Sequence, residues 1–162
     1  MTYSEDDLKN LITCRKRISQ PPRDEMRREG NTLRNEMELE SLDTQHSFYV
    51  FMRQSREFSE NFSIGIDYLP RDEPGRFCLL RCNGRHGGNR EHPHHSHCHI
   101  HRSTAGDVNA GIRAERHIEQ IGEYASYRDA LFYFLKLINI TESDLAKHFP
   151  EIIQADLFGG EA

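Results

Sequence analysis

Histidine and arginine are concentrated in one stretch of the 162-residue chain, residues 76–102. Seven of the ten histidines lie there, with five arginines and one acidic residue, Glu91, so the stretch carries +4 in a protein of net charge −5. Imidazole titrates near neutral pH and can transfer protons through either ring nitrogen. A guanidinium group grips phosphate oxygens in pairs. A basic island on an acidic protein therefore favours an anionic ligand.

The last histidines of this stretch alternate with other residues in the order His97-Cys98-His99-Ile100-His101-Arg102. Alternate residues of a strand share a face. We therefore expect a strand over 97–102, with Cys98 and Ile100 toward the core and three imidazoles on the other face, about 7 Å apart by the rise per residue. If the strand predicted over 76–82 pairs antiparallel with it, Arg81 and His86 lie near this row.

These side chains fit metal-free cleavage of RNA through its own 2′-hydroxyl. That reaction needs a base for the hydroxyl, an acid for the leaving oxygen and a cation for the phosphorane charge. We assign the catalytic roles to Arg81, His86, His97 and His99, and expect Arg81 and His99 to be exposed. The residues assigned to substrate binding are Asn83, Arg85, Arg90, His101 and Arg102. RNA is the expected partner, and no cofactor is expected.

Two other functions remain open from the same residues. The basic island fits a non-catalytic binding or regulatory module that docks an acidic partner or nucleic acid. The row His97-x-His99-x-His101 also fits a metal-dependent protein, since metal sites use three or four such ligands. Glu91 is the only acid in the stretch, and the lack of a carboxylate partner weakens the metal interpretation. We therefore assign no metal ligand.

The order Arg81-x-Asn83-Gly84-x-His86, a loop, then His97-x-His99 resembles the core of the TumE family of prokaryotic toxin–antitoxin toxins and related small proteins. The resemblance implies a toxin-like protein that acts on RNA and is neutralised by an antitoxin encoded nearby. Arg81, His86, His97 and His99 match the family pattern. Asn83 stands where the family has an acid, and His101 where relatives often have an aromatic residue, so a carboxylate role at 83 is in doubt.

Patterning also predicts the elements that position these residues. Leu8, Leu11, Ile12 and Ile18 share one stripe, which predicts an amphipathic helix over 4–18, capped by Ser4 and ended at Pro21-Pro22. Residues 23–30 form a charged connector. Apolar alternation and apolar runs predict antiparallel strands over 32–40, 46–54, 61–69, 76–82 and 97–102. A loop is expected over 103–111, the type of 112–122 is left open, and helices are expected from Ser126 and after Thr141.

The chain is expected to form a single α+β domain over 1–162. Its parts are an N-terminal helix and Pro-Pro break (1–22), a curved antiparallel sheet of about five strands with a His-rich loop (31–102), and C-terminal helices on one face (112–158). No apolar run has the length of a membrane span. An acidic start without signal-peptide features and only four cysteines favour the cytoplasm. The oligomeric state is not indicated.

Overall fold

The computed structural model describes residues 2–86, 96–112, 115–152 and 154, and it is an α+β fold. In chain order the elements are α1 (Glu5–Thr13), β1 (Lys16–Gln20), β2 (Arg27–Glu29), β3 (Thr32–Ser41), β4 (Ser47–Ser55), β5 (Phe62–Leu69), β6 (Phe77–Asn83), β7 (His99–Arg102), α2 (Ala105–Asn109), β8 (His117–Gln120), α3 (Tyr127–Leu137) and α4 (Glu142–His148).

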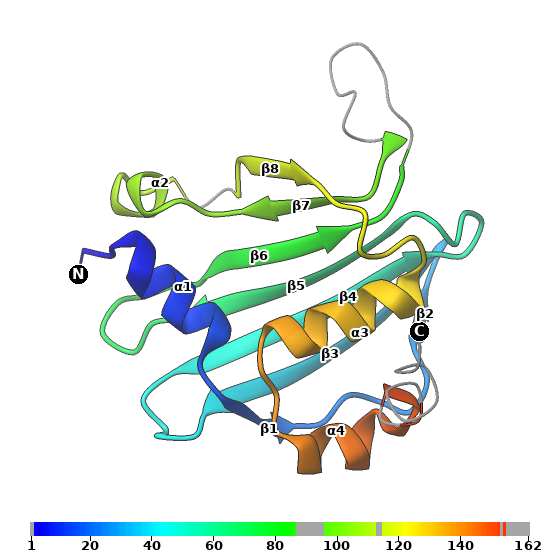
Figure 1. The fold of residues 1–162 in the computed structure, drawn as a ribbon, viewed down its shortest axis with the longest axis horizontal. Coiled ribbons are helices and arrows are strands. Elements are labelled where there is room, and N and C mark those ends of the chain that lie inside the picture. Colours follow the sequence, from blue (N-terminus) through cyan, green and yellow to red (C-terminus); the bar gives the residue numbers. More distant parts are fainter. Residues whose placement is uncertain (1, 87–95, 113–114, 153, 155–162) are drawn as a thin grey trace.

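The strands form one eight-stranded sheet in the order β1-β3-β4-β5-β6-β7-β8, with β2 also paired to β3. Every pair is antiparallel. Helices α1 and α3 lie across one face of the sheet (Figure 1). The predicted class, with its N-terminal helix, antiparallel sheet and C-terminal helices, is confirmed, while the predicted number of strands is too low.

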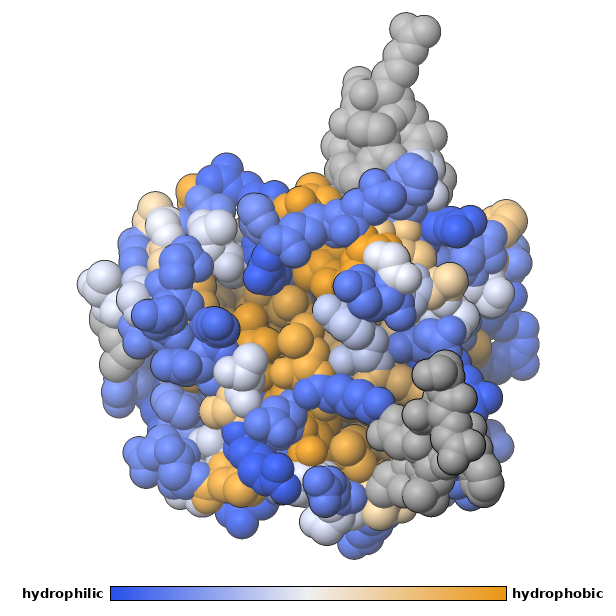
Figure 2. All heavy atoms as spheres, viewed as in Figure 1, coloured by the Kyte–Doolittle hydropathy of each residue, from blue (hydrophilic) through white to orange (hydrophobic). Residues whose placement is uncertain are grey.

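The core lies between this face and the helices. Residues on the long strands alternate between buried and partly exposed, as in β4, because one face of an antiparallel sheet packs on the core and the other does not. The buried row Met37, Val50, Ile66 and Leu80 crosses four neighbouring strands. Figure 2 shows apolar side chains gathered in a hollow in the middle of the helix-bearing face.

The N-terminal helix is shorter than predicted. It ends at Thr13, and Lys16–Gln20 is strand β1, so the prediction of a helix over 4–18 is wrong beyond residue 13. Ile18 has helical spacing from Leu11, but it pairs instead with Leu39 of β3. Pairing with a distant strand therefore outweighs the local periodicity.

Three further predictions are corrected. The connector predicted over 23–30 contains β2, because Arg27–Glu29 turns back to pair with β3. The loop predicted over 103–111 contains helix α2, which Thr104 caps by accepting a hydrogen bond from the backbone N–H of Asp107. The open segment 112–122 supplies the edge strand β8, and the strand predicted over 97–102 begins only at His99.

In the part of the chain that the structure describes, no helix combines the length and the apolar composition needed to cross a membrane.

Candidate active site

Strands β6 and β7 bring the predicted site residues together on the sheet face turned away from α1 and α3, here called the rear face. Arg81 is opposite His101, and Asn83 is opposite His99 in the antiparallel register. Because side chains alternate between faces, all four project to the rear face. Ile100 and Cys82 pair with each other and lie in the core on the other side.

Three imidazoles form a continuous cluster at this place. The ring centroids of His99 and His101 are 5.0 Å apart, and that of His86 is 5.3 Å from His99. Nδ1 of His99 lies 2.7 Å from the carbonyl oxygen of His97, and Nδ1 of His101 lies 3.1 Å from that of Glu115. A carbonyl oxygen only accepts, so both Nδ1 atoms carry a hydrogen. In each neutral ring, Nε2 is then the basic nitrogen.

The guanidinium group of Arg81 sits next to this cluster and is paired with an acid. Its Nε lies 3.2 Å from Oε1 of Glu115, and the Arg81 side chain is 26% exposed. The backbone of Glu115 holds His101 while its carboxylate holds Arg81. A single residue from the segment before β8 therefore fixes two of the predicted site residues.

The exposure of the imidazoles differs from the prediction. His99 has no exposed surface and His101 is 9% exposed, so the expectation of an exposed His99 is wrong. Arg81 is partly exposed, less than the expected exposure. A side chain without exposed surface cannot touch a substrate in this arrangement, whereas His86, partly exposed, and Arg81 can.

A buried tyrosine ties the ends of β6 and β7. The hydroxyl of Tyr124 lies 2.9 Å from the carbonyl oxygen of Asn83 and 3.0 Å from that of His99. Burial raises the pKa of Tyr124 far above its ordinary value, so the hydroxyl keeps its hydrogen and donates it. Asn83 is itself buried, and its side-chain oxygen accepts a hydrogen bond from Ser63 at 3.1 Å.

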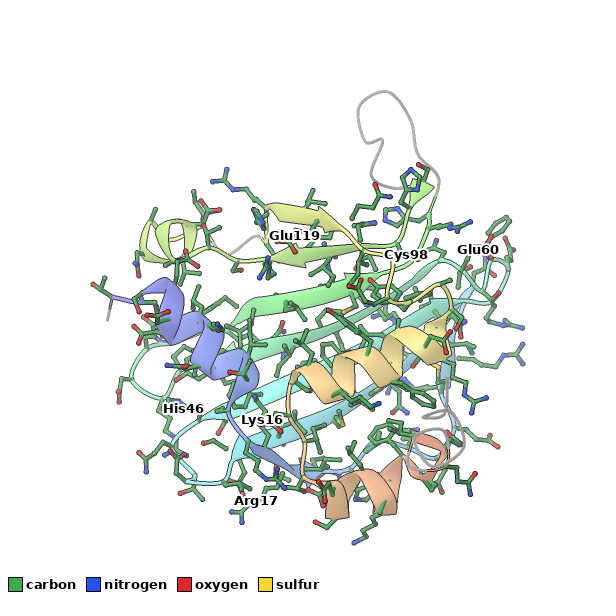
Figure 3. All side chains as sticks on the ribbon, viewed as in Figure 1. Lys16, Arg17, His46, Glu60, Cys98 and Glu119 are labelled. Atoms are coloured by element: carbon green, nitrogen blue, oxygen red, sulfur yellow. The ribbon has the colours of Figure 1, made fainter. Side chains whose placement is uncertain are left out.

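A shallow cleft opens beside His86 at this end of the sheet. Its lining residues are Phe58, Glu60, Asn61, Arg85, His86 and Ala125. Figure 3 labels Glu60 and Cys98 at the same end of the sheet. Arg85 is exposed and approaches the thiol of Cys98, whose pKa is raised by burial and lowered less by that guanidinium. The cleft gives a ligand access to Arg85 and His86.

Other predicted site residues are not part of this cluster. His97 is exposed and precedes β7, where it contributes its carbonyl oxygen rather than its ring. Arg102 projects to the helix-bearing face and pairs with Glu119. His117, which is not among the predicted site residues, is opposite Arg102 in the register, on that same face. Arg90 lies outside the described residues.

Metal ligation has limited support from the described residues. Among them, no group of three or more His, Cys, Asp or Glu side chains is arranged to hold a metal ion. His99 and His101 have the tautomer that metal-binding histidines use, with Nδ1 bonded to a carbonyl. Among the described residues, the three imidazoles of the cluster are not arranged as the three or four ligands that a zinc site requires.

Sequence reasoning missed Glu115 and Tyr124 as site-building residues. The signal at Glu115 was weak, since it is one acid in the mixed-charge run Arg113-Ala114-Glu115-Arg116. Its role depends on β8 folding back along β7.

No protein-family model, curated protein or solved structure matches this chain.

Proposed function

We propose that this protein binds RNA and cleaves it at the imidazole cluster beside Arg81, as the toxin of a toxin–antitoxin pair that acts in the cytoplasm. The observation that supports catalysis is the succession His86, His99 and His101 at ring distances of 5.3 and 5.0 Å, next to a partly exposed arginine. The toxin–antitoxin setting rests on the sequence resemblance alone.

In the proposed reaction, His101 and His86 exchange protons with the RNA. Nε2 of His101 takes the proton of the 2′-hydroxyl, whose oxygen attacks the adjacent phosphorus. The other ring, in its protonated form, donates a proton to the departing 5′-oxygen, which leaves a 2′,3′-cyclic phosphate. His99 lies between the two rings and has no exposed surface, so its role is to position them.

Arg81 supplies the positive charge that the phosphorane needs. A guanidinium group already paired with a carboxylate can exchange it for a phosphate, because two oxygens of a phosphate can accept the same pair of hydrogen bonds. The carboxylate of Glu115 then stands in for the phosphate in the ligand-free protein. Displacement of Glu115 also frees the segment whose carbonyl oxygen accepts the hydrogen bond from His101.

A second candidate function is a non-catalytic module that docks nucleic acid or an acidic partner. The burial of His99 and the low exposure of His101 favour it, because a structural imidazole cluster needs no access to substrate. Arg81, Arg85 and His86 would then bind the partner without chemistry.

Expression in a bacterium tests the proposed function. The wild-type protein is expected to slow growth and fragment cellular RNA, and His101→Gln and His86→Gln are expected to abolish both effects. Loss of a general acid or base costs about a hundred- to ten-thousand-fold in rate, which a growth assay detects. The matched control is His148→Gln on α4, which lies at the opposite edge of the sheet from β7 (Figure 1), and it should remain toxic. Harmless wild-type protein, or folded His101→Gln protein as toxic as wild type, contradicts the catalytic proposal.

A further inference from the structure

Two rows of side chains cross the rear face from the imidazole cluster to the middle of the sheet. The first row runs His99, Asn83, Ser63, Arg53 and Arg34. The second row runs His101, Arg81, Gly65, Phe51 and Glu36. From β7 to β4 is three strand spacings, or about 14 Å. Arg53 and Phe51 on β4 therefore lie on one continuous surface with the candidate active site.

Arg53 and Arg34 are directly opposite each other on β4 and β3, an arrangement that destabilises a sheet because the charges repel. Arg34 is compensated by Glu29, whose Oε2 lies 2.7 Å from its Nε. Arg53 has no ion pair or hydrogen bond to any residue that the structure describes, and its Nε is buried. Burial and the charges of Arg34 and Arg81 lower the pKa of Arg53.

The far end of the Phe51 ring lies over Gly65. A Cβ added at Gly65 would lie 2.3 Å from Cζ of Phe51, so only glycine leaves room for the ring at this place. The guanidinium carbon of Arg53 sits 4.8 Å from the centroid of the same ring. Gly65, Phe51 and Arg53 thus lie next to one another on the rear face, with the ring beside the glycine and the guanidinium group over the ring.

We infer that the stack of Arg53 on Phe51 is a subsite for single-stranded RNA, in which a base stacks on the guanidinium group and Arg34 and Arg81 hold the flanking phosphates. The inference rests on the proposed function for the identity of the nucleic acid. Aromatic rings and arginine planes stack bases of any sequence. Bound phosphate also relieves the repulsion among the three arginines, which lowers the pKa of Arg53 and which Asp67 only partly offsets.

The alternative is that Phe51 merely shields the strand at Gly65, as aromatic residues opposite a glycine often do. Shielding of the strand explains the position of the ring. It does not explain why Arg53 lies over the ring or why Arg34 lies directly opposite Arg53. Elsewhere on the rear face, cations are paired with acids, as in Arg76 with Asp67 at 3.2 Å and Arg81 with Glu115. Arg53 differs in having no directly paired acid among the residues that the structure describes.

Fluorescence anisotropy with a labelled, 2′-O-methylated RNA oligonucleotide tests the subsite, because this probe cannot be cleaved. Arg53→Ala should weaken binding at least about fivefold, the lower end of what one stacked base contributes. Arg53→Lys keeps the positive charge but removes the planar guanidinium group on which a base can stack. Phe51→Leu removes the aromatic ring that the guanidinium group lies over. Both are expected to weaken binding by a smaller factor than Arg53→Ala.

The matched controls are Arg128→Ala and Phe132→Leu. Arg128 sits over Phe132 on α3, with its guanidinium carbon 5.3 Å from the ring centroid, so the same kind of pair is removed from the helix-bearing side. These variants should bind like wild type. Circular dichroism and thermal unfolding confirm the fold of each variant.

The outcomes separate the subsite from the catalytic proposal. If Arg53→Ala loses affinity while the wild-type protein does not cleave unmodified RNA, the subsite stands and the catalytic proposal fails. If the wild-type protein cleaves RNA and folded Arg53→Ala binds the probe as tightly as wild type, the subsite is wrong and catalysis stands. Wild-type protein that does not bind the probe contradicts the subsite directly.

Discussion

Lys16 has no exposed surface, yet its ammonium group is fully bonded. Nζ lies 2.7 Å from the carbonyl oxygen of Ile12, 2.8 Å from that of Cys14 and 2.9 Å from that of Ile138. The first two carbonyls are at the C-terminal end of α1 and the third is at that of α3, where a cation is favourable. Nζ also lies 4.8 Å from the centroid of the Phe48 ring. One side chain therefore joins both helices to the edge of the sheet.

Replacement of Lys16 by methionine is expected to lower the free energy of unfolding by roughly 2–4 kcal/mol at pH 7. In this variant three buried carbonyl oxygens lose their donor, and each unsatisfied group costs about 1–3 kcal/mol. Part of this cost is offset because methionine, unlike lysine, buries no charge. Urea unfolding followed by circular dichroism measures the change. Lys147→Met on the exposed side of α4 is the control and should stay within about 0.5 kcal/mol of wild type.

The stability that Lys16 contributes should rise with pH in an alkaline window. Burial lowers its pKa from 10.5 to about 8 in the folded protein. Between these values the unfolded chain binds more protons than the folded one, so the free energy of unfolding increases as pH rises. Relative to Lys16→Met, the wild-type value should rise by at most about 3 kcal/mol between pH 8 and 10.5. A difference that stays flat or falls across this window contradicts the depressed pKa.

At the residue scale the sequence indicates the cluster but not its burial. The alternation at 97–101 and the arginine at 81 are local patterns, and the register of β6 and β7 places Arg81 opposite His101. The burial of His99 depends on the rings of His86 and His101 and on neighbours from distant segments. Lys16 is similar, because a lysine in a charged sequence gives no local sign of being buried.

At the scale of elements, the end of β6 is closely packed beside the cleft at His86. A Cβ added at Gly84 would lie 2.1 Å from the carbonyl oxygen of Glu60, which is backbone and cannot rotate away. The N–H of Gly84 also donates to the carbonyl of Phe62 at 3.0 Å. The loop between β4 and β5 can therefore approach the site only because residue 84 has no side chain.

We expect Gly84→Ala to lower the free energy of unfolding by about 1–3 kcal/mol, the usual cost of overpacking. Gly106→Ala is the control of opposite sign. Nothing lies within 4 Å of its added Cβ, and alanine within a helix is favoured over glycine by roughly 0.5–1 kcal/mol. Thermal unfolding of both variants checks the pair, and equal shifts in the two would contradict the close packing at Gly84.

The elements that the sequence predicts best are those with a strong period over their whole length. Strands β3 to β6 and helices α3 and α4 lie close to their predicted ranges, since apolar alternation and capping residues mark them locally. Strands β1, β2 and β8 are short and polar. Residues Arg27–Glu29 and His117–Gln120 contain one apolar residue between them, Ile118, so only their pairing partners make them strands. The partners lie elsewhere in the chain, so the sequence of these short segments does not reveal that they are strands.

At the scale of the whole molecule, the net charge of −5 conceals a cationic row on the rear face. Arg34, Arg53 and Arg81 lie close enough that the first and third lower the pKa of the second. An overall negative charge repels RNA at long range, and salt screens that repulsion as well as the local attraction. Contact with phosphate, not the net charge, is expected to dominate the salt dependence.

The logarithm of the RNA-binding constant should fall with the logarithm of salt concentration with a slope of about −2. Each phosphate neutralised on a single strand contributes about −0.7, and three arginines take part. Arg53→Ala should reduce the steepness by about 0.7, and Arg128→Ala should not change it. Anisotropy titrations at several salt concentrations give the slopes. Identical slopes in wild type and Arg53→Ala would show that Arg53 does not contact phosphates of the bound RNA.

The most direct test of the central claim is cleavage of two matched RNA oligonucleotides by the purified protein in buffer containing EDTA. One is all-ribose, and the other carries a single 2′-deoxy substitution at the cleaved position. Attack by the 2′-hydroxyl predicts that the first is cut to a product with a 2′,3′-cyclic phosphate, that the second stays intact there, and that His101→Gln cuts neither. No cleavage of the all-ribose strand, or equal cleavage of both strands, would contradict RNA cleavage by the imidazole cluster.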